Sequence, residues 1–327
     1  AAFEAVPPAD VPPQEVPQEP PQRGEHRVIL RMPGAAPIVR IAYHTPPISH
    51  ADFISLAIAD AILSGGKAIF AFGDSQARSA RLYRALVETE LASSAGSNYH
   101  PSLDPYLMTR GATVRQGHTP AEVEAALLAE VQRLQETFVE PHELRMAIRQ
   151  TQAQFAYASE SVSGQALALG FLAVLDRPER METLFEEFAS VTPEDLQRVA
   201  RTYLTEENRT VGWFVPSETG AGNLSPRASA PAHWAPCWPG TCFYRAPQRG
   251  GIGPETILRA ELDNGAVVLL HERFDSPTFV IEGQIRAGSY FDPPGREGLA
   301  GLVAAMLRRG TVQRTFQEIN LALDGVG

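Results

Sequence analysis

Two stretches of this chain are too poor in core-forming residues to pack, and they divide the rest into two parts. Residues 1–23 hold seven prolines among Glu and Gln, which predicts an extended Pro-rich linker. Residues 218–255 are dominated by Gly, Pro, Ser and Ala, which predicts an interdomain linker. We therefore expect one folded part over residues 24–217 and another over residues 256–327.

Composition limits the classes of function. With 327 residues and an apolar fraction of 44%, the chain can bury a substantial core. The net charge of −10 argues against a nucleic-acid surface. No run reaches the roughly 18 apolar residues of a membrane-spanning helix, and no signal-peptide pattern is present. The chain starts at Ala1 rather than Met and stops just after a helix-like segment, so we expect an internal piece of a longer protein.

The part between the linkers combines strand and helix patterns. Thr119-Pro-Ala-Glu122 predicts a capped helix start, Thr192-Pro-Glu-Asp195 repeats the proline and acidic bias, and Gly65-Gly66 predicts a helix end. Strands are predicted at 27–32, 38–44, 106–110 and 208–215, and further helices at 51–63, 78–91, 140–158 and 162–175. We expect an α+β domain with helices packed on one face of a mainly antiparallel sheet.

The last part begins with a predicted hairpin over residues 257–271, with Asn264-Gly265 as its turn. A strand is predicted over residues 279–287, and a helix from Gly298 onward. An apolar stripe at helical spacing supports that helix; it comprises Leu299, Leu302, Val303, Met306 and Leu307.

The same helix resembles the motif helix of the insulinase/pitrilysin zinc metallopeptidases, which has the form G-x-A-H-x-x-E-H-M-x-F-x-G-T. The frame is kept by Gly298, Ala300, Met306, Gly310 and Thr311. In the family, two histidines four residues apart bind zinc and the glutamate acts as base. Here the two histidine positions hold Gly301 and Ala305, and the glutamate position holds Ala304. Because glycine and alanine neither bind a metal nor transfer a proton, the resemblance implies no catalytic residue and no metal ligand in this chain.

Other motifs extend the resemblance over residues 24–217 and 256–327. Those that match the family in order and spacing are Tyr43-His-Thr-Pro46, Leu63-Ser-Gly-Gly66, residues 79–87, Gln165-Ala166, residues 191–195, Leu262-Asp-Asn-Gly265, Arg286-Ala-Gly-Ser289 and Pro294-Gly295. The resemblance implies an insulinase/mitochondrial-processing-peptidase-like fold. Family proteins of this layout have four related domains in two halves that close around unfolded peptides. This chain would be the second, non-catalytic domain (24–217) plus a truncated start of the third (256–327).

One family feature is missing from the first folded part. The family's substrate-contacting arginine and tyrosine occur in a pattern like L-R-x-x-x-G-L-A-Y, and they usually belong to the fourth domain. The matching stretch here, Leu86 to Ser93, is one residue short and has Val87 and Ser93 instead. This departure fits a second domain.

Three weaker signals were weighed. Gly73-Asp-Ser75, in an apparent insertion at 67–76, resembles an esterase nucleophile block, but no D-x-x-H partner occurs, which favours a surface loop. The eight histidines include no H-x-x-x-H pair, so a zinc site built from this chain alone is not expected. Cys237 and Cys242 make a poor zinc site; a local disulfide in an exported protein and free thiols remain open.

The resemblance implies a non-catalytic portion of a zinc metalloendopeptidase that forms part of a peptide-enclosing chamber. The alternative is a catalytically dead subunit or peptide-binding protein of the same family. The expected partners are peptides or unfolded polypeptides, and a catalytic domain in the same chain or in a partner subunit, with no nucleic acid and no transmembrane segment. Zinc would belong to the full-length enzyme and not to this chain. A bacterial periplasmic or secreted location is favoured over the cytoplasm.

Overall fold

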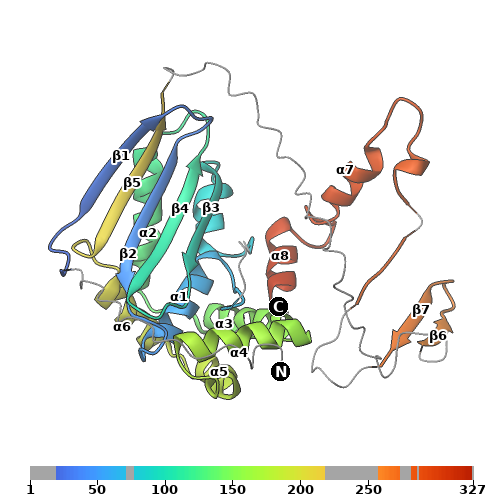
Figure 1. The fold of residues 1–327 in the computed structure, drawn as a ribbon. Coiled ribbons are helices and arrows are strands. Elements are labelled where there is room, and N and C mark those ends of the chain that lie inside the picture. Colours follow the sequence, from blue (N-terminus) through green and yellow to red (C-terminus); the bar gives the residue numbers. More distant parts are fainter. Residues whose placement is uncertain (1–19, 71–76, 218–256, 273–280, 286, 326–327) are drawn as a thin grey trace, which may run out of the picture.

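A computed structural model describes residues 20–70, 77–217, 257–272, 281–285 and 287–325 (Figure 1). A five-stranded sheet with the order β1-β5-β2-β4-β3 organises the first part. Only β1 and β5 run parallel; the other neighbours are antiparallel. The strands are β1 His26–Met32, β2 Ile38–Thr45, β3 Ala92–Tyr99, β4 Tyr106–Val114 and β5 Arg209–Pro216. This confirms the predicted α+β class with a mainly antiparallel sheet.

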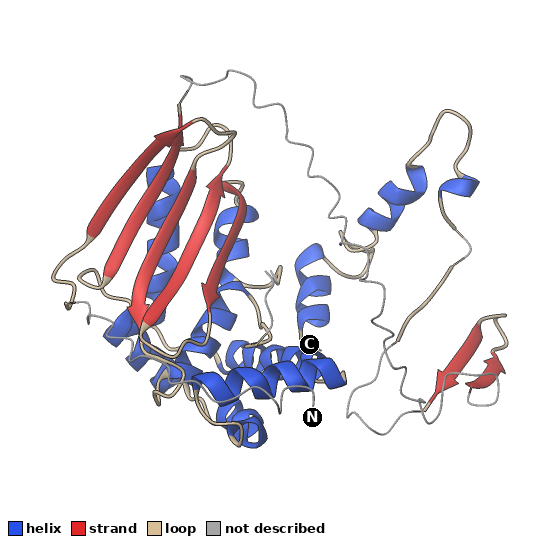
Figure 2. Cartoon of the chain, viewed as in Figure 1, coloured by secondary structure: helices blue, strands red, loops and turns tan. Residues whose placement is uncertain are grey.

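The helices lie behind this sheet or beyond its lower end in the view of Figure 2. They are α1 Phe53–Ser64, α2 Pro120–Glu136, α3 Pro141–Ala158, α4 Val162–Leu175, α5 Arg180–Ala189 and α6 Pro193–Tyr203. In β2, Val39, Ile41 and Tyr43 point toward the helices and are fully buried, whereas Arg40 between them is exposed. The period of two therefore places the core on the helix side and leaves the other face open.

The central helix α1 is apolar on nearly every side, which suits a helix enclosed by other elements. Every residue of α1 except Ala57 is buried, and the helix packs against β3, α3 and α6. Gly65 ends α1 with φ +102°, a conformation that favours glycine, as the Gly-Gly pair predicted. The capping boxes of α2 and α6 are both formed, by Thr119 with Glu122 and by Thr192 with Asp195.

Two local predictions were wrong. The helix expected over residues 78–91 is helical only at 81–87, of which Tyr83–Val87 is a π-helical turn, η1. Strand β3 was not predicted at all. Its sequence, Ala-Ser-Ser-Ala-Gly-Ser-Asn-Tyr, has almost none of the β-branched or aromatic residues that mark strands. Pairing with β4 stabilises it instead, through seven register partners from Ala92 to Tyr99.

The second part contains a hairpin of β6 Ile257–Glu261 and β7 Val267–His271, then η3 Ser289–Phe291, α7 Leu299–Met306 and α8 Phe316–Asp324. The hairpin is as predicted, and it forms a two-stranded sheet of its own. The strand expected over 279–287 is absent from its described residues, 281–285 and 287; residues 279, 280 and 286 lie outside the described residues. The truncated second copy and the boundaries of the two parts stay predictions.

Among the described residues, no single helix is long and apolar enough to cross a membrane. By length and composition only, α3 and α4 would pass such a test together, as a pair bent by 112°.

Candidate functional site

The motif positions singled out in the sequence all lie on α7. Gly301, Ala304 and Ala305 belong to this helix, and Gly301 and Ala305 are separated by one turn, so they share a face. None of the residues of α7 is buried, and a Cβ at Gly301 would meet no atom within 4 Å. Across the described ranges there is no group of three or more His, Cys, Asp or Glu side chains that could hold a metal ion.

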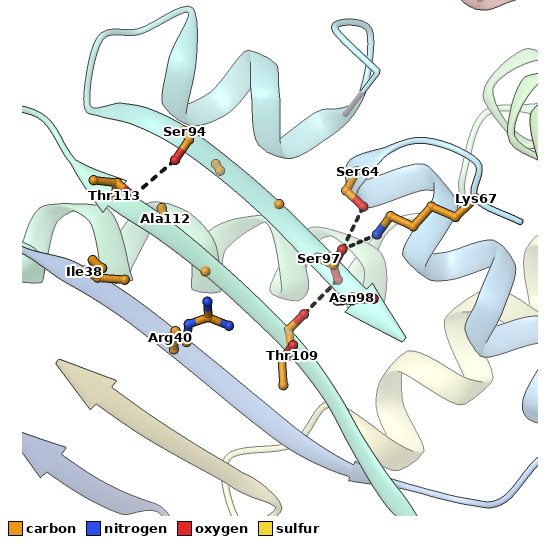
Figure 3. A pocket seen from close by; sticks show the side chains of 13 residues that line it. Ile38, Arg40, Ser64, Lys67, Ser94, Ser97, Asn98, Thr109, Ala112 and Thr113 are labelled. Atoms are coloured by element: carbon orange, nitrogen blue, oxygen red, sulfur yellow. Dashed lines mark hydrogen bonds between the residues drawn. The ribbon is translucent and has the colours of Figure 1, made fainter. Parts of the chain in front are cut away.

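The open face of the sheet has a polar hollow of about 310 Å³ over β2, β4 and β3 (Figure 3). Its floor is built from small and hydroxyl-bearing residues; the lining includes Ser94, Gly96, Ser97, Asn98, Thr109, Gly111, Ala112 and Thr113. Ser94 donates to Thr113 at 3.1 Å, and Ser97 donates to the Thr109 carbonyl at 3.3 Å. These bonds leave a shallow polar basin on the sheet, which we call the basin.

One arginine stands in the middle of the open face with a glycine on each side. The register pairs Arg40 of β2 with Gly111 of β4 and with Gly212 of β5, and pairs Gly111 with Gly96 of β3. A Cβ at Gly111 would lie 3.3 Å from Cγ of Arg40, whereas a Cβ at Gly96 would meet nothing within 4 Å. Glycines within strands often mark the close approach of another backbone. This row therefore leaves space around Arg40 on the surface.

The side chain of Arg40 is exposed and lines the basin. Among the residues that the structure describes, no carboxylate forms an ion pair with Arg40. An arginine has five donors and a permanent positive charge, which suit a carboxylate. The basin can thus accept an anionic group at its centre.

The second cation at the basin is already occupied. Lys67, beyond the outer edge of β3, donates to the Ser97 carbonyl and forms a 3.0 Å ion pair with Asp60 of α1. Ser64 also donates to the Ser97 carbonyl, at 3.2 Å. Figure 3 shows both side chains converging on this edge of β3. Lys67 therefore anchors α1 to the edge strand and leaves Arg40 as the cation available to a ligand.

An apolar hollow of about 290 Å³ adjoins the basin and shares Ile38 and Arg40 with it. Val28 and Leu30 of β1 and Phe214 of β5 also line it, and the two β1 side chains are about half exposed, at 49% and 53%. The open face thus changes from polar over β3 and β4 to apolar over β5 and β1, with Arg40 between the two halves.

Behind the sheet, a second arginine of the same strand pair is enclosed by the core. Arg110 is 1% exposed, and its guanidinium lies 4.9 Å from the centre of the Tyr43 ring. Burial lowers the pKa of Arg110, and burial also raises the pKa of Tyr43 despite the opposing charge of Arg110. Because these groups point away from the open face, they have no direct access to a ligand in the basin.

Sequence reasoning missed the arrangement around Arg40. The three glycines are far apart in the chain and become neighbours only through strand register. Among the histidines, His50 accepts a hydrogen bond from the Asp52 amide at 3.1 Å within its loop. Cys237, Cys242 and Gly73-Asp-Ser75 lie outside the described residues.

Comparisons with known proteins give a family and a fold. Residues 1–151 match the family model described as the peptidase M16 inactive domain. No curated protein matches the chain.

Several solved structures are similar. A protease from Helicobacter pylori has 22% sequence identity and a TM-score of 0.59, over 65% of this chain and 50% of its own. The inactive peptidase domain of a candidate zinc protease from Bordetella parapertussis has 27% identity and a TM-score of 0.50, over 58% of this chain and 98% of its own. A peptidase M16 inactive domain from Pseudomonas fluorescens has 15% identity and a TM-score of 0.51, over 63% of this chain and 47% of its own.

The chain spans half the length of the Helicobacter pylori protein and nearly all of the Bordetella domain. At 22% and 15% identity, the Helicobacter and Pseudomonas structures establish the fold alone. The family model adds the assignment to an inactive domain, in agreement with the resemblance of the motifs. This chain is therefore related to the insulinase-family (M16) peptidases, and its residues 1–151 match the inactive domain of that family.

Proposed function

We propose that this chain forms part of the wall of a peptide-enclosing chamber in an M16-family zinc endopeptidase, and that the open face of its sheet contacts the enclosed peptide. The observation that carries the proposal is the sheet face around Arg40, where a polar basin and an apolar hollow adjoin and where Arg40 has no carboxylate partner among the described residues. An extended peptide offers backbone amides, acidic groups and apolar side chains, which match these three features.

The free edge of β1 supports the same function. In the described part of the chain, β1 pairs only with β5, and all seven of its residues are exposed. An exposed edge strand presents unpaired amides and carbonyls, which can bind a peptide by strand addition.

The residues of α7 do not fit zinc. The family's chemistry uses zinc held by histidines, whereas α7 has Gly301, Ala304 and Ala305 at the corresponding positions. We propose that the zinc-binding domain lies elsewhere in the same chain or in a partner subunit. Metal analysis of the dialysed protein should find no stoichiometric zinc; one tightly held zinc per chain, lost on mutating a histidine, would contradict this assignment.

The alternative is a catalytically dead, peptide-binding member of the family. The Bordetella inactive peptidase domain, 98% of which aligns with 58% of this chain, supports this alternative. Both functions use the same peptide-binding face and differ in the location of catalysis. Any residues that precede Ala1 distinguish them, because an H-x-x-E-H helix followed by a glutamate there would support the peptidase.

Peptide binding is tested with the full chain and a fluorescently labelled extended peptide that carries Asp and Glu. Arg40→Ala should weaken binding by about two- to fivefold, the range of a partly exposed ion pair, and the loss should shrink at high salt. The control is Arg115→Ala, because Arg115 is 49% exposed, pairs with Glu90 and lies outside the basin.

A matched peptide with Asn and Gln should bind the wild type and Arg40→Ala equally. No saturable binding by the wild type, or the same loss in both arginine variants, would refute the role of the basin.

A further inference from the structure

The helix α8 is the element of the second part that docks on the first domain. Phe316 and Asp324, two turns apart on α8, contact Arg78, Ser79 and Gln150 of the domain. Asn320, between them on the same row, is 2% exposed. Figure 1 shows α8 beside the domain, whereas α7 and the β6–β7 hairpin stand away from it. We infer that this surface is a docking site for α8, which latches the later part of the chain to the domain.

The contacts at the end of α8 are specific hydrogen bonds. The carboxylate of Asp324 accepts from the Ser79 amide at 3.0 Å, and the Asp324 carbonyl accepts from the Gln150 side chain at 2.6 Å. The same Gln150 side chain accepts from the Gly66 amide at 3.1 Å, directly after the end of α1. One glutamine thus joins α8 to the loop that leaves the central helix.

The start of α8 is held by charge and ring contacts. The guanidinium of Arg78 lies 5.7 Å from the centre of the Phe316 ring, and that of Arg309 lies 5.3 Å from it. Gln317 donates to Glu88 at 3.2 Å. A cation near the face of an aromatic ring is attracted to it. The Phe316 ring is therefore held both by Arg78 of the domain and by Arg309 of its own segment.

The domain side of the docking site is rigid. Arg81, whose side chain is 8% exposed, donates two parallel 2.7 Å hydrogen bonds to Glu143 of α3. This bidentate pair fixes the segment after Ser79 to the helix that carries Gln150. The two donors that receive Asp324 are therefore set in place by the domain itself.

The docked row of α8 has two polar residues, Asn320 and Asp324, and one aromatic residue, Phe316, and nearby leucines stay exposed. Leu321 is 41% exposed and Leu323 is 44% exposed. Ser79 Oγ and Asn320 Oδ1 are buried without a hydrogen-bond partner among the described residues, which leaves polar atoms for ordered water. This contact is a latch that can release, since opening it exposes the Phe316 ring but no fully buried apolar side chain of α8.

The position of Asp324 is unfavourable for the isolated helix but favourable for a docked one. A negative charge in the last turn of a helix opposes the helix dipole, so aspartate there weakens the isolated helix. Docking supplies the amide of Ser79 as its partner. Replacement by alanine should therefore favour the helix itself while removing the contact.

Hydrogen exchange of the full chain by mass spectrometry tests the latch. Asp324→Ala should speed exchange in peptides covering residues 77–80 and 316–324 by about tenfold or more, the factor expected for a lost hydrogen bond to a charged group. Asp324→Asn keeps an acceptor and should stay close to the wild type. Gln313→Ala, in the exposed segment before α8, is the control.

Two results would overturn the latch. One is equal exchange in the wild type and Asp324→Ala. The other is protection of residues 316–324 that rises with protein concentration, because this would show that α8 docks on a second copy of the chain.

Discussion

At the scale of single residues, buried Arg180 joins α5 to the end of α4 and to the loop before α1. Its side chain is 8% exposed; it donates to Asp176 at 2.9 Å, to Glu187 at 2.8 Å and to the Ile48 carbonyl. Arg180→Met keeps an apolar stem but leaves both carboxylates without their cation. We expect the free energy of unfolding to fall by about 3 kcal/mol, measured by urea denaturation. Arg133→Met, at a 62% exposed side chain 3.8 Å from Glu130, should cost less than about 0.5 kcal/mol.

The ion pairs of Arg180 also determine the direction in which pH changes the stability of the protein. Burial raises the pKa of Glu187, but hydrogen bonds from Arg180 and Thr183 outweigh it and lower the pKa below its ordinary 4.5. The stabilisation from Glu187 is thus complete above that ordinary value and is lost as the pH falls through the lower folded pKa. Acid should therefore destabilise the wild type more steeply than Arg180→Met. Parallel acid slopes of the two proteins would contradict this role of Arg180.

At the scale of elements, the end of α1 depends on a glycine. Gly65 has φ +102° and ψ 154°, and an added Cβ would lie 2.6 Å from the Cβ of Ala77. We expect Gly65→Ala to lower the free energy of unfolding by about 1–3 kcal/mol, measured by thermal or urea denaturation. Gly96→Ala is the matched control, because its Cβ would meet nothing and the change should be neutral or slightly stabilising. Equal effects of the two substitutions would refute the conformational argument.

Particular elements show how far the sequence determines the fold. The helix starts at Thr119 and Thr192 were predictable because capping is local chemistry. Strand β3 was not, since tertiary pairing overrides the low strand propensity of its Ser, Gly and Asn residues. The helix at 180–189 was not predicted either, although it is amphipathic. The surroundings of Arg40 required the strand register, which no local pattern contains.

At the scale of the whole molecule, the β6–β7 hairpin and α7 of the second part are much less buried than the helices of the first domain. The hairpin pairs only with itself, α7 has no buried residue, and Leu302 of α7 is 62% exposed. Isolated hairpins and short uncovered helices are marginally stable in water. We expect amides in residues 267–270 and 302–307 to exchange faster than those of α1 by on the order of 100-fold or more. Equal protection would show that residues 256–327 form a complete folding unit.

The parallel pairing of β1 with β5 has a consequence for the order in which the chain can fold. Gln22 donates to the Arg209 carbonyl, although the two residues are 187 positions apart, and the β1–β5 register runs from His26 opposite Thr210 to Met32 opposite Pro216. A ribosome delivers the chain from its N-terminus, so β1 emerges first among the strands but has no partner until β5 has been made. Contacts this distant in sequence form slowly, because a long loop must close before they form. Within this sheet, the first strand to be synthesised therefore waits, with its backbone amides and carbonyls unpaired, until the last strand arrives.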